Sequence, residues 1–311
     1  MFSYKTKLLS ICLFYFLTLS TVSQNKKIDS LKTLLKESNS ITEKIDINIL
    51  LGKLNNRSNV DFAFKYFKKA IRLSEKENLA SYKTQSYSSI ATSYIIKGKF
   101  DSAHFYFNKS EKLLPIIKDY KIKTAFFGDK GVLHYYEGNI EKAAENFENA
   151  LKISKLENDK EDIIKFSNNT ALAYTQLGKN ERAIEIYYET LKLAEKEDDK
   201  KQVGKLLNNI GLIYESMNQF KNAWECYEKS LVVKKDYGTQ IDNINAHYNI
   251  ANMQLKLSDK TNDSLLLNEA KKNFITTLNL SNTNQYGNGK LYGLEGLGQI
   301  AFNKKNYTEA T

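Results

Sequence analysis

Small and apolar side chains recur along the chain at helical spacing, and short polar stretches separate the groups. Each group begins with an alanine, has an aromatic residue four positions later, and has a small residue three positions after that. Offsets of three, four and seven place these side chains on one face of an α-helix. The pattern therefore predicts a helix after each of the alanines, which are Ala63, Ala103, Ala143, Ala183, Ala223, Ala270 and Ala310.

The alanines are spaced at intervals of 40, 40, 40, 40, 47 and 40 residues, so the chain is built from repeats. The long interval contains the polar stretch SDKTNDSLLLN, for which we expect a loop insertion of seven residues. A second small residue lies twelve positions before most of the alanines, at Ala91, Gly131, Ala171, Gly211, Ala251 and Gly298. The expected turn residues between the two helices are Ser58, Gly98, Gly138, Gly178, Asn218 and Ser258.

Each repeat therefore predicts a helical hairpin in which small residues allow a close crossing and an aromatic side chain fills the remaining wedge. The aromatic residues are Phe67, Phe107, Phe147, Tyr187, Tyr227 and Phe274, and the small residues after them are Ala70, Ser110, Ala150, Thr190, Ser230 and Thr277. A single hairpin cannot bury its apolar face alone, so neighbouring hairpins are expected to stack.

The order small residue, tyrosine, turn, alanine, aromatic, small residue resembles the tetratricopeptide repeat (TPR) family. Tyr94, Tyr174 and Tyr214 match the family tyrosine, and Pro115, the only proline, falls where the family often has one. The resemblance covers residues 41–311 and implies an all-α, right-handed α-solenoid of about seven hairpins. The period of 40 residues, against the common 34, is similar to the longer-helix branch found in kinesin light chains and bacterial peptide-sensing regulators. The family tryptophan is missing, and Leu51 stands where a small residue is expected.

The two ends differ from the repeats. Residues 24–40 contain Ile28, Leu31, Leu34 and Leu35 at helical spacing, which predicts an N-terminal cap helix. The last hairpin is cut short after GLGQIAFNKKNYTEAT, so either this end frays or a downstream segment is missing.

Residues 1–23 have the features of a signal peptide: Lys5 and Lys7, an apolar run from Leu8 to Leu19, and small residues before Gln24. We therefore expect an exported bacterial protein, periplasmic or envelope-associated, which contacts a membrane only through an uncleaved signal or a missing downstream segment. Within the mature chain Cys226 stands alone, so no internal disulfide is expected.

Composition agrees with a helical chain, because one proline and 14 glycines among 311 residues are too few for many hairpin turns between strands. The net charge is +10, but basic and acidic residues alternate along every segment, so nucleic-acid binding is not inferred.

No pattern of residues predicts an enzyme, a cofactor or a metal site. His104, His134 and His247 are far apart in the sequence and occupy different repeat positions, and there is no HExxH motif. Cys226 is interpreted as a packing residue rather than a nucleophile. Gly287, Gly289 and Gly293 miss the spacing of a phosphate-binding loop, and Gly287 and Gly289 are expected in a flexible connection.

The asparagines of the first helices are the candidate binding residues. In the TPR family the first helices line a concave groove, and the resemblance places in it Lys165, Asn168, Asn169, Lys205, Asn208, Asn209, Asn249 and Asn252. Asn169, Asn209 and Asn249 occupy equivalent positions and would form a ladder whose amides can pair with the backbone of an extended peptide. The lysines would favour an acidic peptide or a terminal carboxylate. Alternatively, the amides hydrogen-bond to one another and fix the stacking of the helices.

The expected function is therefore non-enzymatic binding of a protein or peptide by an exported adaptor or scaffold. The lysine and asparagine pattern of the family's chaperone-tail clamp is absent, so recognition of a chaperone tail is not expected. The other hypothesis is that the chain is the extracytoplasmic sensory input region of a signalling protein with a histidine kinase or DNA-binding domain downstream.

Overall fold

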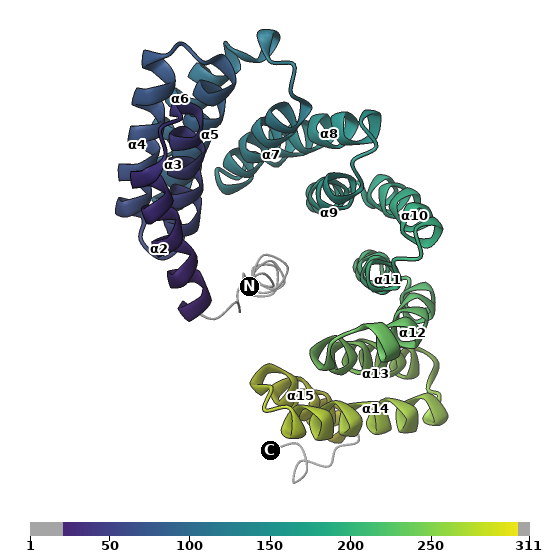
Figure 1. Cartoon of the computed structure of the whole chain (residues 1–311). Helices are drawn as coiled ribbons and strands as arrows, with labels where there is room; N and C mark the ends of the chain where they lie inside the picture. Colours follow the sequence, from purple (N-terminus) through teal and green to yellow (C-terminus); the bar gives the residue numbers. More distant parts are fainter. Residues whose placement is uncertain (1–20, 304–311) are drawn as a thin grey trace. The chain divides into compact units, whose positions relative to one another are not determined.

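The computed structural model describes residues 21–303, and within this range every regular element is helical (Figure 1). The α-helices are α2 (Thr21–Glu37), α3 (Ile41–Asn55), α4 (Val60–Lys76), α5 (Ala80–Ile96), α6 (Phe100–Glu111), α7 (Tyr120–Tyr136), α8 (Ile140–Leu156), α9 (Lys160–Gln176), α10 (Asn180–Lys196), α11 (Lys200–Ser216), α12 (Phe220–Tyr237), α13 (Gln240–Thr261), α14 (Ser264–Thr283) and α15 (Gly287–Asn303). A short 3₁₀ helix, η1 (Leu114–Ile116), lies between α6 and α7. The predicted all-α fold is confirmed.

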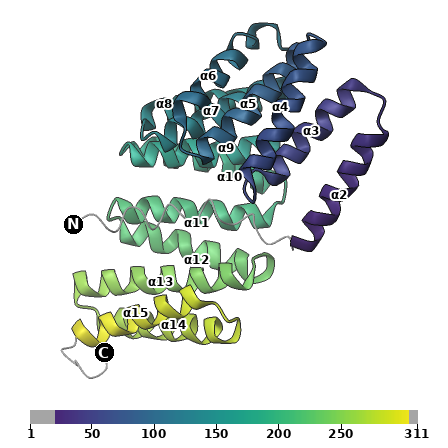
Figure 2. The same cartoon turned by 90° about the vertical axis from the view of Figure 1, so that its left-hand side faces the viewer.

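The helices form two compact units, which meet in the sequence between Asn139 and Ile140. The first unit contains α2 to α7, and the second contains α8 to α15. Within the second unit, α9 and α10, α11 and α12, and α13 and α14 are antiparallel hairpins that stack in sequence order; Figure 2 shows α11, α12 and α13 side by side. Within each unit, helices that are neighbours in the sequence pack against one another, as expected for a stack of repeats.

The repeat residues are buried, as predicted. The six repeat alanines that lie within residues 21–303 are 0% exposed, and the six aromatic residues that follow them are all buried. The seventh, Ala310, lies outside the described residues. The small residues after the aromatics are buried too. Two of them donate a hydrogen bond to the first helix of their hairpin: Ser110 to the carbonyl of Thr84 at 2.9 Å, and Ser230 to that of Gly204 at 2.6 Å. Thr277 instead donates to the carbonyl of Asn273 in its own helix, at 2.9 Å.

Small residues are required where the two helices of a hairpin cross. A methyl group added at Gly211 would lie 2.6 Å from the ring of Tyr227, and one added at Gly52 would lie 2.3 Å from the ring of Phe67. The small residue missing at Leu51 is therefore present one position later, at Gly52. Leu51 is fully buried beside it.

Four of the predicted turn residues have a left-handed backbone, with φ of +67° at Gly98, +79° at Gly138, +72° at Gly178 and 59° at Asn218. This region of conformation favours glycine and, after it, asparagine. The prediction for Ser258 is wrong, because this residue lies inside α13 and is buried.

The stretch SDKTNDSLLLN is not a seven-residue loop, because the surplus residues lengthen two helices. α13 has 22 residues and α14 has 20, and only Asn262 and Asp263 lie between them. Asn262 has a left-handed backbone, and the Asp263 carboxylate accepts hydrogen bonds from the amides of Leu265 and Leu266. A polar pair is enough to end one helix and begin the next.

The prediction of a flexible connection at Gly287 and Gly289 is also wrong, because both residues lie in the first turn of α15. A methyl group at Gly289 would lie 2.2 Å from the Ser281 hydroxyl oxygen, so this glycine allows α15 to approach α14.

The predicted cap helix is present as α2, although it begins at Thr21. Its Ile28, Leu31 and Leu35 pack against a cluster formed by Ile47, Leu51 and Tyr66. Residues 1–20 of the predicted signal segment lie outside the described residues. Among residues 21–303, no helix has both the length and the apolar character that crossing a membrane requires.

Candidate functional site

The structure places the predicted binding residues on α9, α11 and α13, all within the second unit. Asn168 and Asn169 lie on α9, Asn208 and Asn209 on α11, and Asn249 and Asn252 on α13. All six asparagines are half-buried. Repeat periodicity brings them together, because equivalent positions in successive hairpins face the same side of the stack.

The amides are hydrogen-bonded diagonally between neighbouring first helices. Asn209 donates from Nδ2 to Oδ1 of Asn168 at 3.1 Å, and Asn249 donates in the same way to Asn208, also at 3.1 Å. The expected ladder joins equivalent positions of the repeats. Each observed bond instead runs from one repeat position to the position before it on the preceding first helix, from Asn209 to Asn168 and from Asn249 to Asn208. The amides therefore do connect α9, α11 and α13, as the structural alternative requires.

The diagonal bonds use only half of each amide. In the part of the chain that the structure describes, no hydrogen bond occupies Nδ2 of Asn168 or Oδ1 of Asn209 and Asn249, and the Asn169 side chain makes none. None of these atoms is among the buried polar atoms that lack a partner, so they are accessible to water. We call the side chains of Asn168, Asn169, Asn208, Asn209 and Asn249 the amide row. The bonded ends of these amides connect the helices, and the unbonded ends can contact a ligand.

Asn252 differs from the other asparagines because it belongs to a group of bonds around Glu215. The Glu215 carboxylate accepts hydrogen bonds from Asn252 at 3.3 Å, from Lys256 at 2.7 Å and from the Tyr227 hydroxyl at 2.9 Å. These contacts join α11, α12 and α13, so the position of Asn252 fits a structural role.

The two predicted lysines are exposed beside the asparagines. The Lys165 ammonium lies 4.4 Å from the centroid of the Phe166 ring and 3.6 Å from the Asp162 carboxylate. Its side chain is 57% exposed, so this ion pair is weak and the charge is available to a ligand.

Sequence reasoning missed Lys234, which is buried beneath the same row. Its ammonium donates to Oδ1 of Asn208 at 3.3 Å. The pKa of Lys234 is lowered to about 8, chiefly because the side chain is buried; the nearby charge of Lys205 contributes to the lowering, whereas Asp242 opposes it. A signal existed in the sequence, because four of the five equivalent repeat positions hold small residues, namely Ser74, Ser154, Ala194 and Ser281, all of which are buried; the fifth holds Leu114.

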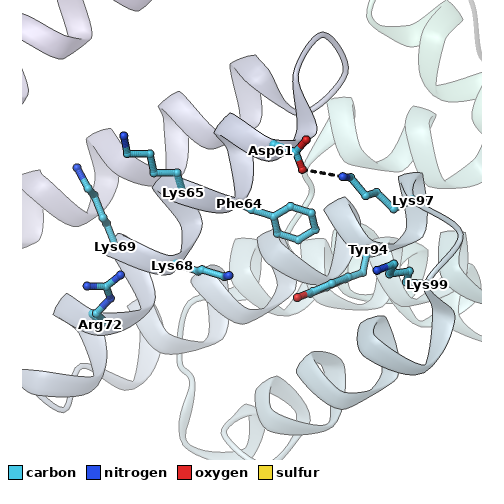
Figure 3. A pocket seen from close by; sticks show the side chains of 9 residues that line it. All are labelled: Asp61, Phe64, Lys65, Lys68, Lys69, Arg72, Tyr94, Lys97 and Lys99. Carbon is cyan, nitrogen blue, oxygen red and sulfur yellow. Dashed lines mark hydrogen bonds and ion pairs between the residues drawn. The ribbon is translucent and has the colours of Figure 1, made fainter.

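A basic groove lies on the first unit and was not predicted either (Figure 3). It has a volume of about 590 Å³ and is lined by Lys65, Lys68, Lys69 and Arg72 of α4, by Tyr94 of α5, and by Asp61, Phe64, Lys97 and Lys99. Phe64 and Tyr94 pack with ring centroids 4.6 Å apart, and Lys97 pairs with Asp61 at 2.6 Å. We call this surface the basic groove. The excess of basic over acidic residues in α4 is the signal in the sequence that could have revealed it.

Two of the three histidines are close together, although their positions in the sequence gave no indication of this. His104 of α6 and His134 of α7 have ring centroids 5.6 Å apart, and both bond to Glu137. His247 instead contacts Oδ1 of Asn273 at 2.9 Å, a contact between α13 and α14.

Cys226 is buried, and burial raises the pKa of its thiol, which disfavours the nucleophilic thiolate.

Comparison with family models matches residues 162–236 to the tetratricopeptide repeat. This segment contains α10, α11 and most of α9 and α12, including the asparagines of α9 and α11. No curated protein sequence matches the chain significantly.

Solved structures share the fold at low sequence identity. A STAND protein with a tetratricopeptide repeat sensor from Pyrococcus horikoshii is 17% identical, with a TM-score of 0.64; the match covers 92% of this chain and 46% of that one. The C-terminal part of a TPR repeat-containing protein from Cytophaga hutchinsonii is 16% identical, with a TM-score of 0.58, over 86% of this chain and 91% of that one. The apo form of the quorum sensor NprR from B. thuringiensis is 14% identical, with a TM-score of 0.53, over 92% and 90%. The predicted TPR-type α-solenoid is confirmed.

Proposed function

We propose that the chain is a non-enzymatic, exported scaffold that binds a protein or peptide on the face formed by α9, α11 and α13. The observation that carries this proposal is the half-used amide row. The diagonal bonds leave donors and acceptors of the asparagine side chains on α9, α11 and α13 open to a ligand.

The chemistry of the row suits an extended, acidic peptide. An extended backbone presents donors and acceptors at regular spacing, and a side-chain amide can pair with either. The exposed ammonium groups of Lys165 and Lys205 flank the asparagines and would attract carboxylates. TPR-type solved structures include proteins described as sensors, which supports a binding role for the fold.

The basic groove offers a second surface for the same class of ligand. It is lined by six cationic side chains and a single carboxylate, that of Asp61, and the rings of Phe64 and Tyr94 supply apolar surface. An acidic segment with an apolar side chain would match both features.

A binding experiment can separate the two surfaces. The wild-type chain, an Asn169→Ala variant and a Lys65→Ala/Lys69→Ala variant are used as baits against an envelope fraction of the source organism. Asn222→Ala, an exposed change on α12, is the matched control. Asn169 makes no side-chain hydrogen bond within residues 21–303, so its loss should leave stability unchanged.

A ligand retained by the wild type and by the Asn222→Ala control, but lost from the Asn169→Ala variant, would support binding on the asparagine face. Loss only from the lysine variant would place the ligand in the basic groove instead. Equal retention by all baits would contradict binding at either surface.

Export has a separate test: the N-terminal sequence of the mature protein should begin at Gln24, and an intact N-terminus in the cytoplasmic fraction would contradict export.

A sensory input role is the second candidate function. It is favoured by the fold shared with the repeat sensor of the STAND protein and with the quorum sensor NprR. The test is the coding sequence beyond Thr311. A kinase or DNA-binding domain in the same reading frame would support this role, and a stop codon directly after Thr311 would exclude it.

A further inference from the structure

His104, His134 and Glu137 form a cluster that the binding function does not use. The Glu137 carboxylate lies between the two imidazole rings, with Oε1 at 2.6 Å from Nε2 of His104 and Oε2 at 3.1 Å from Nδ1 of His134. One nitrogen of each histidine and one carboxylate oxygen all lie within 4.8 Å of one another. Three side chains thus bring possible metal-coordinating atoms close together.

The backbone holds this arrangement in place. His134 and Glu137 are three residues apart at the C-terminal end of α7, so they share a helix face. The turn that follows is fixed by Gly138, with φ of +79°, and by a hydrogen bond from the amide of Asn139 to the carbonyl of His134. His104 approaches from the second turn of α6.

Two imidazoles and a carboxylate are the donor set preferred by zinc and neighbouring divalent transition metals. A bound metal ion would take the place of the protons shared between Glu137 and the two imidazole nitrogens. A small outward movement of the Glu137 carboxylate would make room for the ion. The side chain of His134 is 8% exposed, whereas those of Glu137 and His104 are 22% and 36% exposed. One side of the cluster is therefore closed, and the other leaves room for water as a fourth ligand.

The surrounding charges permit a cation here. The cluster lies at the C-terminal end of α7, where the helix dipole is negative. The charge of Lys130 acts against a positive charge on His134, and Lys130 forms an ion pair with Glu111 at 2.7 Å.

We propose that His104, His134 and Glu137 bind one divalent transition-metal ion, with zinc the best fit to the donor set. The ion joins α6 to the end of α7 within the first unit, and it is independent of the amide row on the second unit.

Zinc titration of the full chain, without a purification tag, tests this proposal by calorimetry. The chain should bind one Zn²⁺ per molecule, and His104→Ala and Glu137→Gln should each weaken binding by at least about 10-fold. His247→Ala is the matched control, because this histidine lies on α13 away from the cluster, and it should bind as tightly as the wild type.

Cobalt gives a second readout, because its visible absorption reports imidazole coordination. His104 is partly exposed, so the His104→Ala variant should fold, and circular dichroism checks this. Equal affinity in all variants, weak binding of several ions, or loss of binding only in His247→Ala would overturn the proposal.

Discussion

At the scale of single residues, the most demanding positions are the alanines at the hairpin crossings. Ala183 is 0% exposed and lies where α10 crosses its partner helix. Replacing Ala183 by Trp should overpack this crossing and lower the free energy of unfolding by about 1–3 kcal/mol. Urea denaturation measures the change. Lys192→Trp, at an exposed position of the same helix, is the control, and an unchanged midpoint for Ala183→Trp would contradict the assigned repeat register.

Lys234 leads to a prediction about the pH dependence of stability, because its ammonium group is buried. The folded-state pKa is lowered to about 8, below the ordinary value of 10.5, so the unfolded chain binds more protons between these two pH values. Stability should therefore rise with pH through this window, on the order of 1–2 kcal/mol between pH 7.5 and 9.5. The charged groups facing Lys234 are Lys205, which opposes its protonation, and Asp242, which favours it.

Denaturation at several pH values, with Lys234→Met beside the wild type, checks this. The variant should be more stable at pH 7.5, and its stability should depend less on pH. A parallel pH dependence in both proteins would mean that another group is responsible.

Residue periodicity predicted the core but not these chemical exceptions. Ala183 and Tyr227 could be assigned from the sequence because every repeat needs a small residue and a ring at those positions. Lys234 was missed because a lysine on a helix is normally exposed. His104 and His134 were missed because 30 residues separate them and only the packing of α6 near α7 brings their rings together.

At the scale of helices, the amide row has two parts that can be separated by mutation. Asn209→Ala removes the hydrogen bond to Asn168 and should lower stability by about 1 kcal/mol. Asn169→Ala removes no side-chain hydrogen bond within residues 21–303 and should leave stability unchanged. Thermal denaturation of both variants measures the difference. Equal destabilisation by the two changes would contradict the diagonal pairing.

The turns between helices were predicted well where the repeat is regular and poorly where it is not. Gly98, Gly138, Gly178 and Asn218 end helices through a left-handed backbone, which the sequence reveals directly. In the sixth hairpin, composition favoured a loop, but the two residues Asn262 and Asp263 make the whole turn. Extra residues lengthen the two helices because helical residues continue to form backbone hydrogen bonds, whereas a loop would leave them to water.

At the scale of the whole molecule, the sequence predicted the class of fold because a 40-residue period leaves few alternatives for burying the hairpin faces. It did not predict the division into two compact units between Asn139 and Ile140, because the repeat pattern continues across this point. The same reason explains which of the candidate surfaces could be predicted from the sequence. The asparagines of α9, α11 and α13 repeat with the period and were found, whereas the basic groove lies where α4 of the first hairpin meets α5 of the second.

A stack of repeats should also lose its structure locally. Phe274 is 1% exposed and packs in a cluster with Ala251, Leu255, Ala270 and Ile300, which lie on α13, α14 and α15. Phe274→Ala should destabilise this cluster by about 3–5 kcal/mol, because it removes a large buried ring. Since each hairpin contacts only its neighbours, α13 to α15 should open without unfolding α9 and α10. Hydrogen exchange resolved by peptide should show faster exchange in α13–α15 and unchanged exchange in α9–α10. If all the helices of the second unit exchanged faster to the same extent, that unit would be unfolding as a single cooperative body.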